Sequence, residues 1–335
     1  MDTSSTPFTT STKSPQIVSD LWFSDGNLIL ETENSLFKVY SGLLVRKSSV
    51  FRDMFTFPQP NDHKDVPTVR LYDSTEELTW FLKAILDPEF FEPPPSTTDL
   101  SIVGAILRLS SKYDVQFLRR RALLHVQTTY PSTLRAWKRR DTHRSIPPID
   151  NSVRVYMTSS HWVTYRTPQP FAILPLVREF ELDWALPAVL YCLCSYNVSQ
   201  IIDGVTFRTR HLTLNEDDRR KVLVGRAELV HLQTNLSFRC LRSTPHTDCS
   251  SPADCVEQLR KWLNHASSWN IADPLDYLDE NWDALEGDLC LACFTQSKLD
   301  TEATQREIWA KLPLIFELPS WSELKDLEEK AMDGM

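Results

Sequence analysis

The chain has 335 residues, of which 41% are hydrophobic and 24% charged, and its net charge is −9 at pH 7. This length exceeds the usual size of one hydrophobic core, so we expect two domains. The acidic balance disfavours a nucleic-acid binder, because affinity for phosphates depends on clustered cations. The seven glycines lie too far apart for a nucleotide-binding loop, and the HExxH and GxSxG motifs of metalloproteases and serine hydrolases are missing.

The first residues do not have the pattern expected of an export signal. Residues 1–18 are rich in Ser, Thr and Pro, without an apolar run of signal-peptide length, and we expect a disordered tail. The longest uncharged run, residues 184–202, contains Pro187 and Asn197, which favours a buried helix over a membrane span. We therefore expect an intracellular protein, in the cytoplasm or nucleus, with no membrane partner and with reduced cysteines.

Short strands are predicted early in the chain. Asp25-Gly26 is a turn dipeptide of the kind that a tight hairpin uses. Residues 27–32 and 35–40 are rich in β-prone side chains, with a turn at Glu33-Asn34 between them. Residues 68–72 predict one further short strand.

Helices are predicted between and after these strands. Ser48 or Ser49 can cap a helix that carries Phe51 on its apolar face. Ser74 and Glu77 form a capping-box pattern ahead of a helix that Asp87-Pro88 stops. Residues 99–128 predict two more helices with a bend at 112–114.

The segment 43–55, LLVRKSSVFRDMF, resembles the helical core of BTB/POZ domains, which is usually similar to vLaarSpvFraMF. The order of elements over 19–128 is also similar to that family. The resemblance implies an α+β domain, a small sheet flanked by helices, that binds proteins and catalyses no reaction. In the family, dimers bury apolar surface from the first helix and the N-terminal segment, which here implies Trp22, Leu43 and Leu44 as protein-contact residues.

Two departures from the family affect the choice of partner. Many members have a His where this chain has Tyr40. Members that recruit a cullin-type ubiquitin-ligase scaffold often carry an apolar-x-Glu motif after the Met-Phe pair, whereas the segment here is TFPQPNDHKD. The sequence therefore predicts a non-catalytic protein-interaction protein with self-association as a candidate. The alternatives are a transcriptional co-regulator, a ubiquitin-ligase adaptor whose recruitment motif is not evident, and an enzyme or metal protein that uses C-terminal Cys and His residues.

The second part of the chain is predicted to be mainly α-helical. Residues 129–167 predict a short helix followed by a linker or insertion, and 168–335 an all-helical domain. Its order is similar to the region that follows the BTB domain in a group of uncharacterised fungal BTB proteins, a resemblance that implies no chemistry. The helices are expected at 171–180, 184–196, 215–241, after Ser251, at 282–299, at 302–312 and after the capping pattern Ser320-x-x-Glu323.

Cysteine spacing is the sharpest chemical signal. Cys249 and Cys255 form one pair, and Cys290-x-x-Cys293 has the spacing of a metal site. Four thiolates suit a tetrahedral structural zinc, with Cys240 and His246 as substitutes. A buried helix face explains the second pair equally well, because free cysteine behaves as a small hydrophobe. Both interpretations stay open, and the sequence assigns no catalytic residue, metal ligand or cofactor.

Two basic clusters occur at residues 119–121 and 135–140. A nucleic-acid surface is one interpretation. Under the acidic total, a solvated helix face is the favoured one, so nucleic acid is not an expected partner.

Overall fold

The computed structural model describes residues 15–56, 66–143, 169–207, 209–242, 244–267, 273–275 and 282–333. Most of the predicted tail (1–18) and most of the predicted short helix and linker (129–167) lie outside these residues. The chain divides into two compact units, Met1–His125 and Val126–Met335, where the sequence suggested a boundary at residue 128. Within the described part, no helix is both long enough and apolar enough to cross a membrane.

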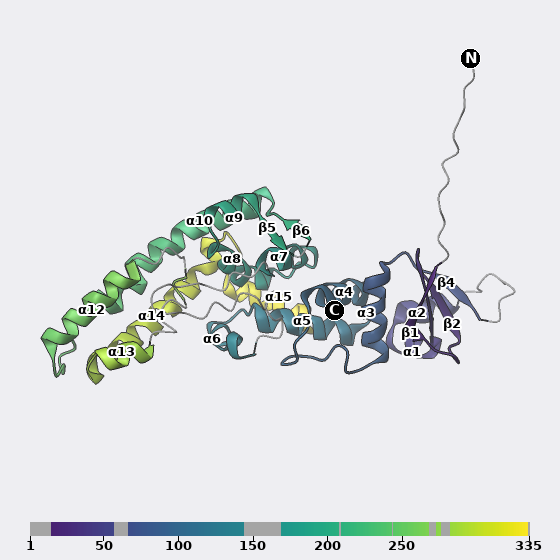
Figure 1. Cartoon of the computed structure of the whole chain (residues 1–335), viewed down its shortest axis with the longest axis horizontal. Coiled ribbons are helices and arrows are strands. Elements are labelled where there is room, and N and C mark those ends of the chain that lie inside the picture. Colours follow the sequence, from purple (N-terminus) through teal and green to yellow (C-terminus); the bar gives the residue numbers. More distant parts are fainter. Residues whose placement is uncertain are drawn as a thin grey trace, which may run out of the picture. The chain divides into compact units, whose positions relative to one another are not determined.

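A four-stranded sheet opens the first unit (Figure 1). The strand order is β1-β3-β2-β4, with β2 and β3 antiparallel and the two outer pairs parallel. Alternate residues of β2 and β3 are buried, as expected of strands that pack one face on a core. The strands are β1 (Gln16–Trp22), β2 (Leu28–Glu31), β3 (Ser35–Val39) and β4 (Thr68–Arg70).

The hairpin of this sheet turns at Glu33-Asn34, as predicted, but Asp25-Gly26 makes no hairpin. The strands that Asp25-Gly26 joins, β1 and β2, are separated by β3, so they do not pair. Gly26 has a different role, because a Cβ there would lie 3.1 Å from backbone atoms of Lys38. The Asp25 carboxylate accepts a hydrogen bond from the Tyr40 hydroxyl at 2.7 Å.

Five helices pack with the sheet or extend the first unit, and two of their predicted caps can be compared. The Ser48 Oγ accepts the Phe51 N–H at 3.0 Å, so Ser48 caps as predicted. The predicted capping box at Ser74 is wrong. The Ser74 side chain makes no cap hydrogen bond, and the Glu77 side chain pairs with Arg108 at 2.6 Å. The helices are α1 (Ser41–Lys47), α2 (Ser49–Thr56), α3 (Thr75–Leu86), α4 (Leu100–Lys112) and α5 (Gln116–Thr129), the last of which continues into the second unit.

The second unit is mainly helical. It was predicted to be all-helical, and this is wrong, because β5 (Val205–Phe207) and β6 (Arg210–Leu212) form an antiparallel pair. Gly204, with φ of 89°, lets the chain leave the preceding helix at this point. The described helices are α6 (Leu134–His143), α7 (Gln169–Glu179), η2 (Asp183–Ala185), α8 (Leu186–Cys194), α9 (Val198–Asp203), α10 (Glu216–Leu232), η3 (Gln233–Ser237), α11 (Arg239–Arg242), α12 (Pro252–Ser267), α13 (Trp282–Asp288), α14 (Leu291–Ile315) and α15 (Trp321–Asp333).

The boundaries of α13 and α14 differ from the prediction. The expected helix over 282–299 is broken at Leu289-Cys290, and the expected helix over 302–312 lies inside α14. Cys290 has extended backbone angles and stands immediately before α14. Its N–H donates to the Cys255 sulfur, so a tertiary contact, which local sequence does not encode, fixes this break.

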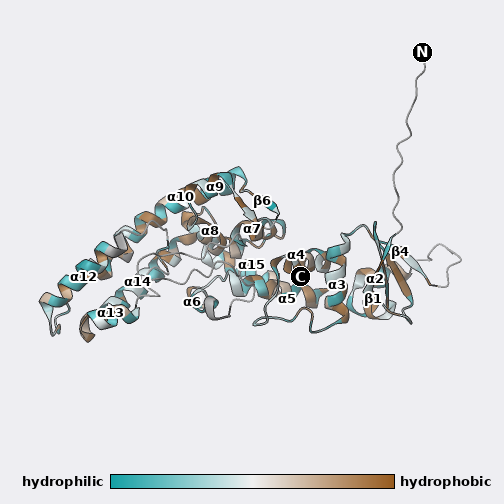
Figure 2. Ribbon diagram, in the orientation of Figure 1, coloured by the Kyte–Doolittle hydropathy of each residue, from teal (hydrophilic) through white to brown (hydrophobic). Residues whose placement is uncertain are grey.

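The packing in the described part of the second unit includes two cores. One is aromatic: Trp137 and Trp309 lie 5.5 Å apart, and Trp309 stacks on Trp321 at 5.1 Å. The other lies where α11–α14 meet and includes Phe238, Leu259 and Phe294. Along α12, hydrophilic and hydrophobic residues alternate as the ribbon turns (Figure 2), because one face of this helix packs on the second core.

Candidate functional site

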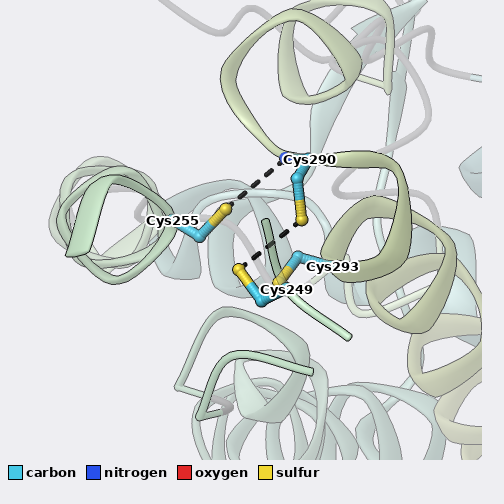
Figure 3. Close-up of side chains that lie close together, drawn as sticks. All are labelled: Cys249, Cys255, Cys290 and Cys293. Atoms are coloured by element: carbon cyan, nitrogen blue, oxygen red, sulfur yellow. Dashed lines mark hydrogen bonds between the residues drawn. The ribbon is translucent and has the colours of Figure 1, made fainter. Parts of the chain in front are cut away.

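Four cysteines from two distant segments meet in the second unit (Figure 3). Cys249 lies in the turn before α12 and Cys255 in the first turn of that helix. Cys290 and Cys293 lie at the start of α14. The four Sγ atoms are all within 4.8 Å of one another. The structure therefore brings together the two cysteine pairs that the sequence singled out.

Backbone N–H groups point at these sulfur atoms. The Cys290 N–H donates to the Cys255 Sγ and the His246 N–H to the Cys293 Sγ, each at 3.4 Å. The Cys290 and Cys249 sulfurs lie 3.6 Å apart and share a weak hydrogen bond (Figure 3). The first two contacts thus connect the cysteine sulfurs to backbone N–H groups in the loop before α12 and just before α14.

The thiols differ in acidity for physical reasons. Hydrogen bonds from the N–H groups of Cys293 and Ser250 lower the pKa of Cys290 to about 6, because they stabilise its thiolate. Burial raises the pKa of Cys293 to about 12 and also raises that of Cys255. The Cys290 thiol is therefore more acidic than those of Cys255 and Cys293, whose pKa values burial raises.

Apolar side chains surround the sulfurs. Cys255 and Cys293 are 1% and 3% exposed, while Cys249 and Cys290 are partly buried. The donor set can hold a soft tetrahedral metal ion or be oxidised to disulfides, and it has no partner base for nucleophilic catalysis among the hydrogen bonds described. The surrounding buried cluster consists of Phe238, Cys240, Leu241, Leu259, Leu285, Leu289 and Phe294, with Trp262, Leu263 and Trp282 packed against it.

The two substitute ligands do not take part. The His246 ring is turned to Asp248, whose N–H donates to Nδ1 at 3.1 Å. Cys240 is 1% exposed and belongs to the apolar cluster, but its sulfur is not in the four-sulfur group. The candidate ligand set therefore consists of the four cysteines.

The three predicted protein-contact residues have different environments in the first unit. Leu43 on α1 is 44% exposed, and Trp22 at the end of β1 is partly buried. Leu44 is fully buried, so its inclusion is corrected: its side chain packs into the core and has no surface to offer a partner. The three residues thus do not form one exposed patch.

The second basic cluster lies beside acidic side chains. Arg135, Arg139 and Arg140 line a groove of about 920 Å³, which Glu329 and Asp333 also line. The Arg140 guanidinium stacks on the Trp137 ring, 3.2 Å from its centroid. Mixed charge in the groove agrees with the favoured interpretation of a solvated helix face over a phosphate-binding surface.

The sequence gives no signal for a buried polar contact at Glu328. The buried Glu328 on α15 accepts hydrogen bonds from Gln127, at 2.7 Å, and from the Ser132 hydroxyl. These groups are about two hundred positions apart in the chain, and no local pattern marks Glu328 among its acidic neighbours.

No protein-family model matches the chain, and neither do any curated proteins or solved structures.

Proposed function

We propose that this is a non-catalytic protein-interaction protein that acts through its first unit, a BTB/POZ-like domain, and associates with a second copy of itself there. The proposal rests on the sequence resemblance of residues 43–55 and on the surface of the elements concerned. The observation that carries it is the exposure of Leu43, an apolar side chain left on the outer face of α1 while Leu44 fills the core.

The N-terminal strand supports the same surface. β1 stands at one end of the strand order, and Ile17 on it is 56% exposed. Edge strands are common sites of association, because their backbone groups and apolar side chains can be covered by another chain. In the family that the sequence resembles, the first helix and the N-terminal segment are the parts that a dimer buries.

The test is the oligomeric state of the full chain as a function of concentration. Wild-type protein and the Leu43→Glu variant are compared by sedimentation velocity, and Val224→Glu is the matched control. Val224 is 46% exposed and lies on α10 in the second unit, so it adds the same charge at a similar exposure away from the proposed surface.

We expect the wild type and the Val224→Glu variant to dimerise equally, and Leu43→Glu to dimerise more weakly, because a charge would be buried at the contact. A chain that stays monomeric at every concentration would contradict self-association. Equal dimerisation of all three proteins would show that the contact lies elsewhere.

A further inference from the structure

The cysteine cluster has the dimensions of a single-ion site. A tetrahedral zinc with Zn–S bonds of about 2.3 Å holds its ligand sulfurs about 3.8 Å apart. In this chain the four sulfurs all lie within 4.8 Å of one another, and Cys249 and Cys290 are 3.6 Å apart. Changes of up to about 1 Å in the sulfur–sulfur distances would therefore place all four on one ion.

A purely hydrophobic role of the four cysteines would not account for the backbone N–H groups that donate to their sulfurs. The His246 and Cys290 N–H groups donate to the sulfurs of Cys293 and Cys255. Such outer contacts orient metal ligands and offset the negative charge of bound thiolates. Two of the cysteines are also only partly buried, unlike typical core cysteines.

Backbone placement supports a metal ion in a second, independent way. Cys290 stands just before α14 and Cys293 in its first turn, so the positive end of a 25-residue helix faces the sulfurs. Cys255 lies in the first turn of α12. The N-terminal ends of two helices thus face the four sulfurs. Four thiolates and one divalent cation would carry a net negative charge, which the positive ends of these helices stabilise.

We propose that Cys249, Cys255, Cys290 and Cys293 bind one structural zinc ion. Thiolate ligands in tetrahedral geometry are the donor set that zinc prefers, and four protein ligands leave no position for water or substrate. The ion joins the turn before α12 to the break between α13 and α14. It thereby fixes the start of α14, which the local sequence does not determine.

The first test is the metal content of the full chain, purified under reducing conditions and analysed by mass spectrometry of the elements. We expect about one zinc per chain for the wild type. The double variant Cys290→Ser, Cys293→Ser should lose it. The control is Cys192→Ser, a partly buried cysteine outside the cluster, which should keep it.

A second test needs no variant and so does not depend on how well a variant folds. The wild-type chain is stripped of metal under reducing conditions and titrated with Co²⁺. We expect the visible absorption of tetrahedral cobalt and the near-ultraviolet charge-transfer bands of four thiolate ligands, saturating at about one ion per chain. Zinc should then displace the cobalt and abolish the absorption.

Three results would overturn the proposal. The first is that the wild-type protein contains no stoichiometric zinc and also shows no thiolate–cobalt bands. The second is that the purified chain contains iron in place of zinc. The third is that the double variant keeps the zinc content of the wild type. Each would assign the cluster to another role, and none bears on the association proposed for the first unit.

Discussion

At the scale of single residues, burial separates side chains that the sequence presents as equivalent. Leu43 and Leu44 are adjacent leucines, yet one is 44% exposed and the other fully buried. Glu328 and Glu329 are adjacent acids, yet Glu328 is 8% exposed and hydrogen-bonded while Glu329 is exposed. The direction in which each Cβ leaves its helix decides the environment, and a helix advances about 100° per residue.

The Glu328 contact makes a quantitative prediction. Glu328→Ala leaves the Gln127 amide and the Ser132 hydroxyl without their acceptor, which should lower the free energy of unfolding by about 1–3 kcal/mol. The control Glu329→Ala removes an exposed acid and should change it by less than about 0.5 kcal/mol. Urea unfolding measures both, and an equal effect of the two variants would contradict the assigned contact.

At the scale of elements, most helices and strands follow from local sequence. The capping pattern at Ser320-x-x-Glu323 was predicted correctly, with the Ser320 N–H and hydroxyl both donating to Glu323. The errors occur where distant contacts decide. Glu77 leaves its predicted cap for Arg108 on another helix, and α13 is separated from α14 where Cys290 binds Cys255. Local propensity is a weak preference that a tertiary contact can override.

The contact of α10 with the end of α14 gives a prediction at this scale. A Cβ on Gly225 would overlap the ring of Phe316, which is fully buried and cannot move aside. Gly225→Ala should therefore lower the free energy of unfolding by about 1–3 kcal/mol, although alanine is the better helix former.

The matched control is Gly287→Ala in α13, where a Cβ would meet no atom within 4 Å. There the gain in helix propensity should leave stability unchanged or raise it by up to about 1 kcal/mol. Thermal unfolding compares the two, and a rise in Tm for Gly225→Ala would refute the close approach of the helices.

At the scale of the whole molecule, the two units depend on different stabilising features. The first unit builds its core from a sheet and amphipathic helices, with Phe51 stacked on Tyr113 at 4.6 Å. The cluster around the cysteines has nine buried residues, contributed by α11–α14 and the residues that flank them. Small apolar cores often need a metal ion or another cross-link, because they bury too little surface to offset the entropy of ordering the chain.

This contrast predicts where metal removal acts. Treating the reduced full chain with a strong zinc chelator should increase hydrogen exchange in α12 and around 289–294, because these segments meet at the sulfurs. Exchange in α3 and α4 of the first unit should stay the same. A uniform change across both units, or none in α12, would contradict a local structural role for the ion.

The sequence by itself determined the β2–β3 hairpin, the mainly helical second unit, the helix caps at Ser48 and Ser320 and the cysteine pairs, because these depend on periodicity and spacing within a few residues. The resemblance of residues 43–55 to BTB/POZ domains remains a prediction from the sequence. Only the tertiary structure decided that the four sulfurs converge, that α14 begins after Cys290 and that Glu328 is buried. These features depend on residues tens to hundreds of positions apart, whose approach is set by the packing of whole helices and carries no local signal.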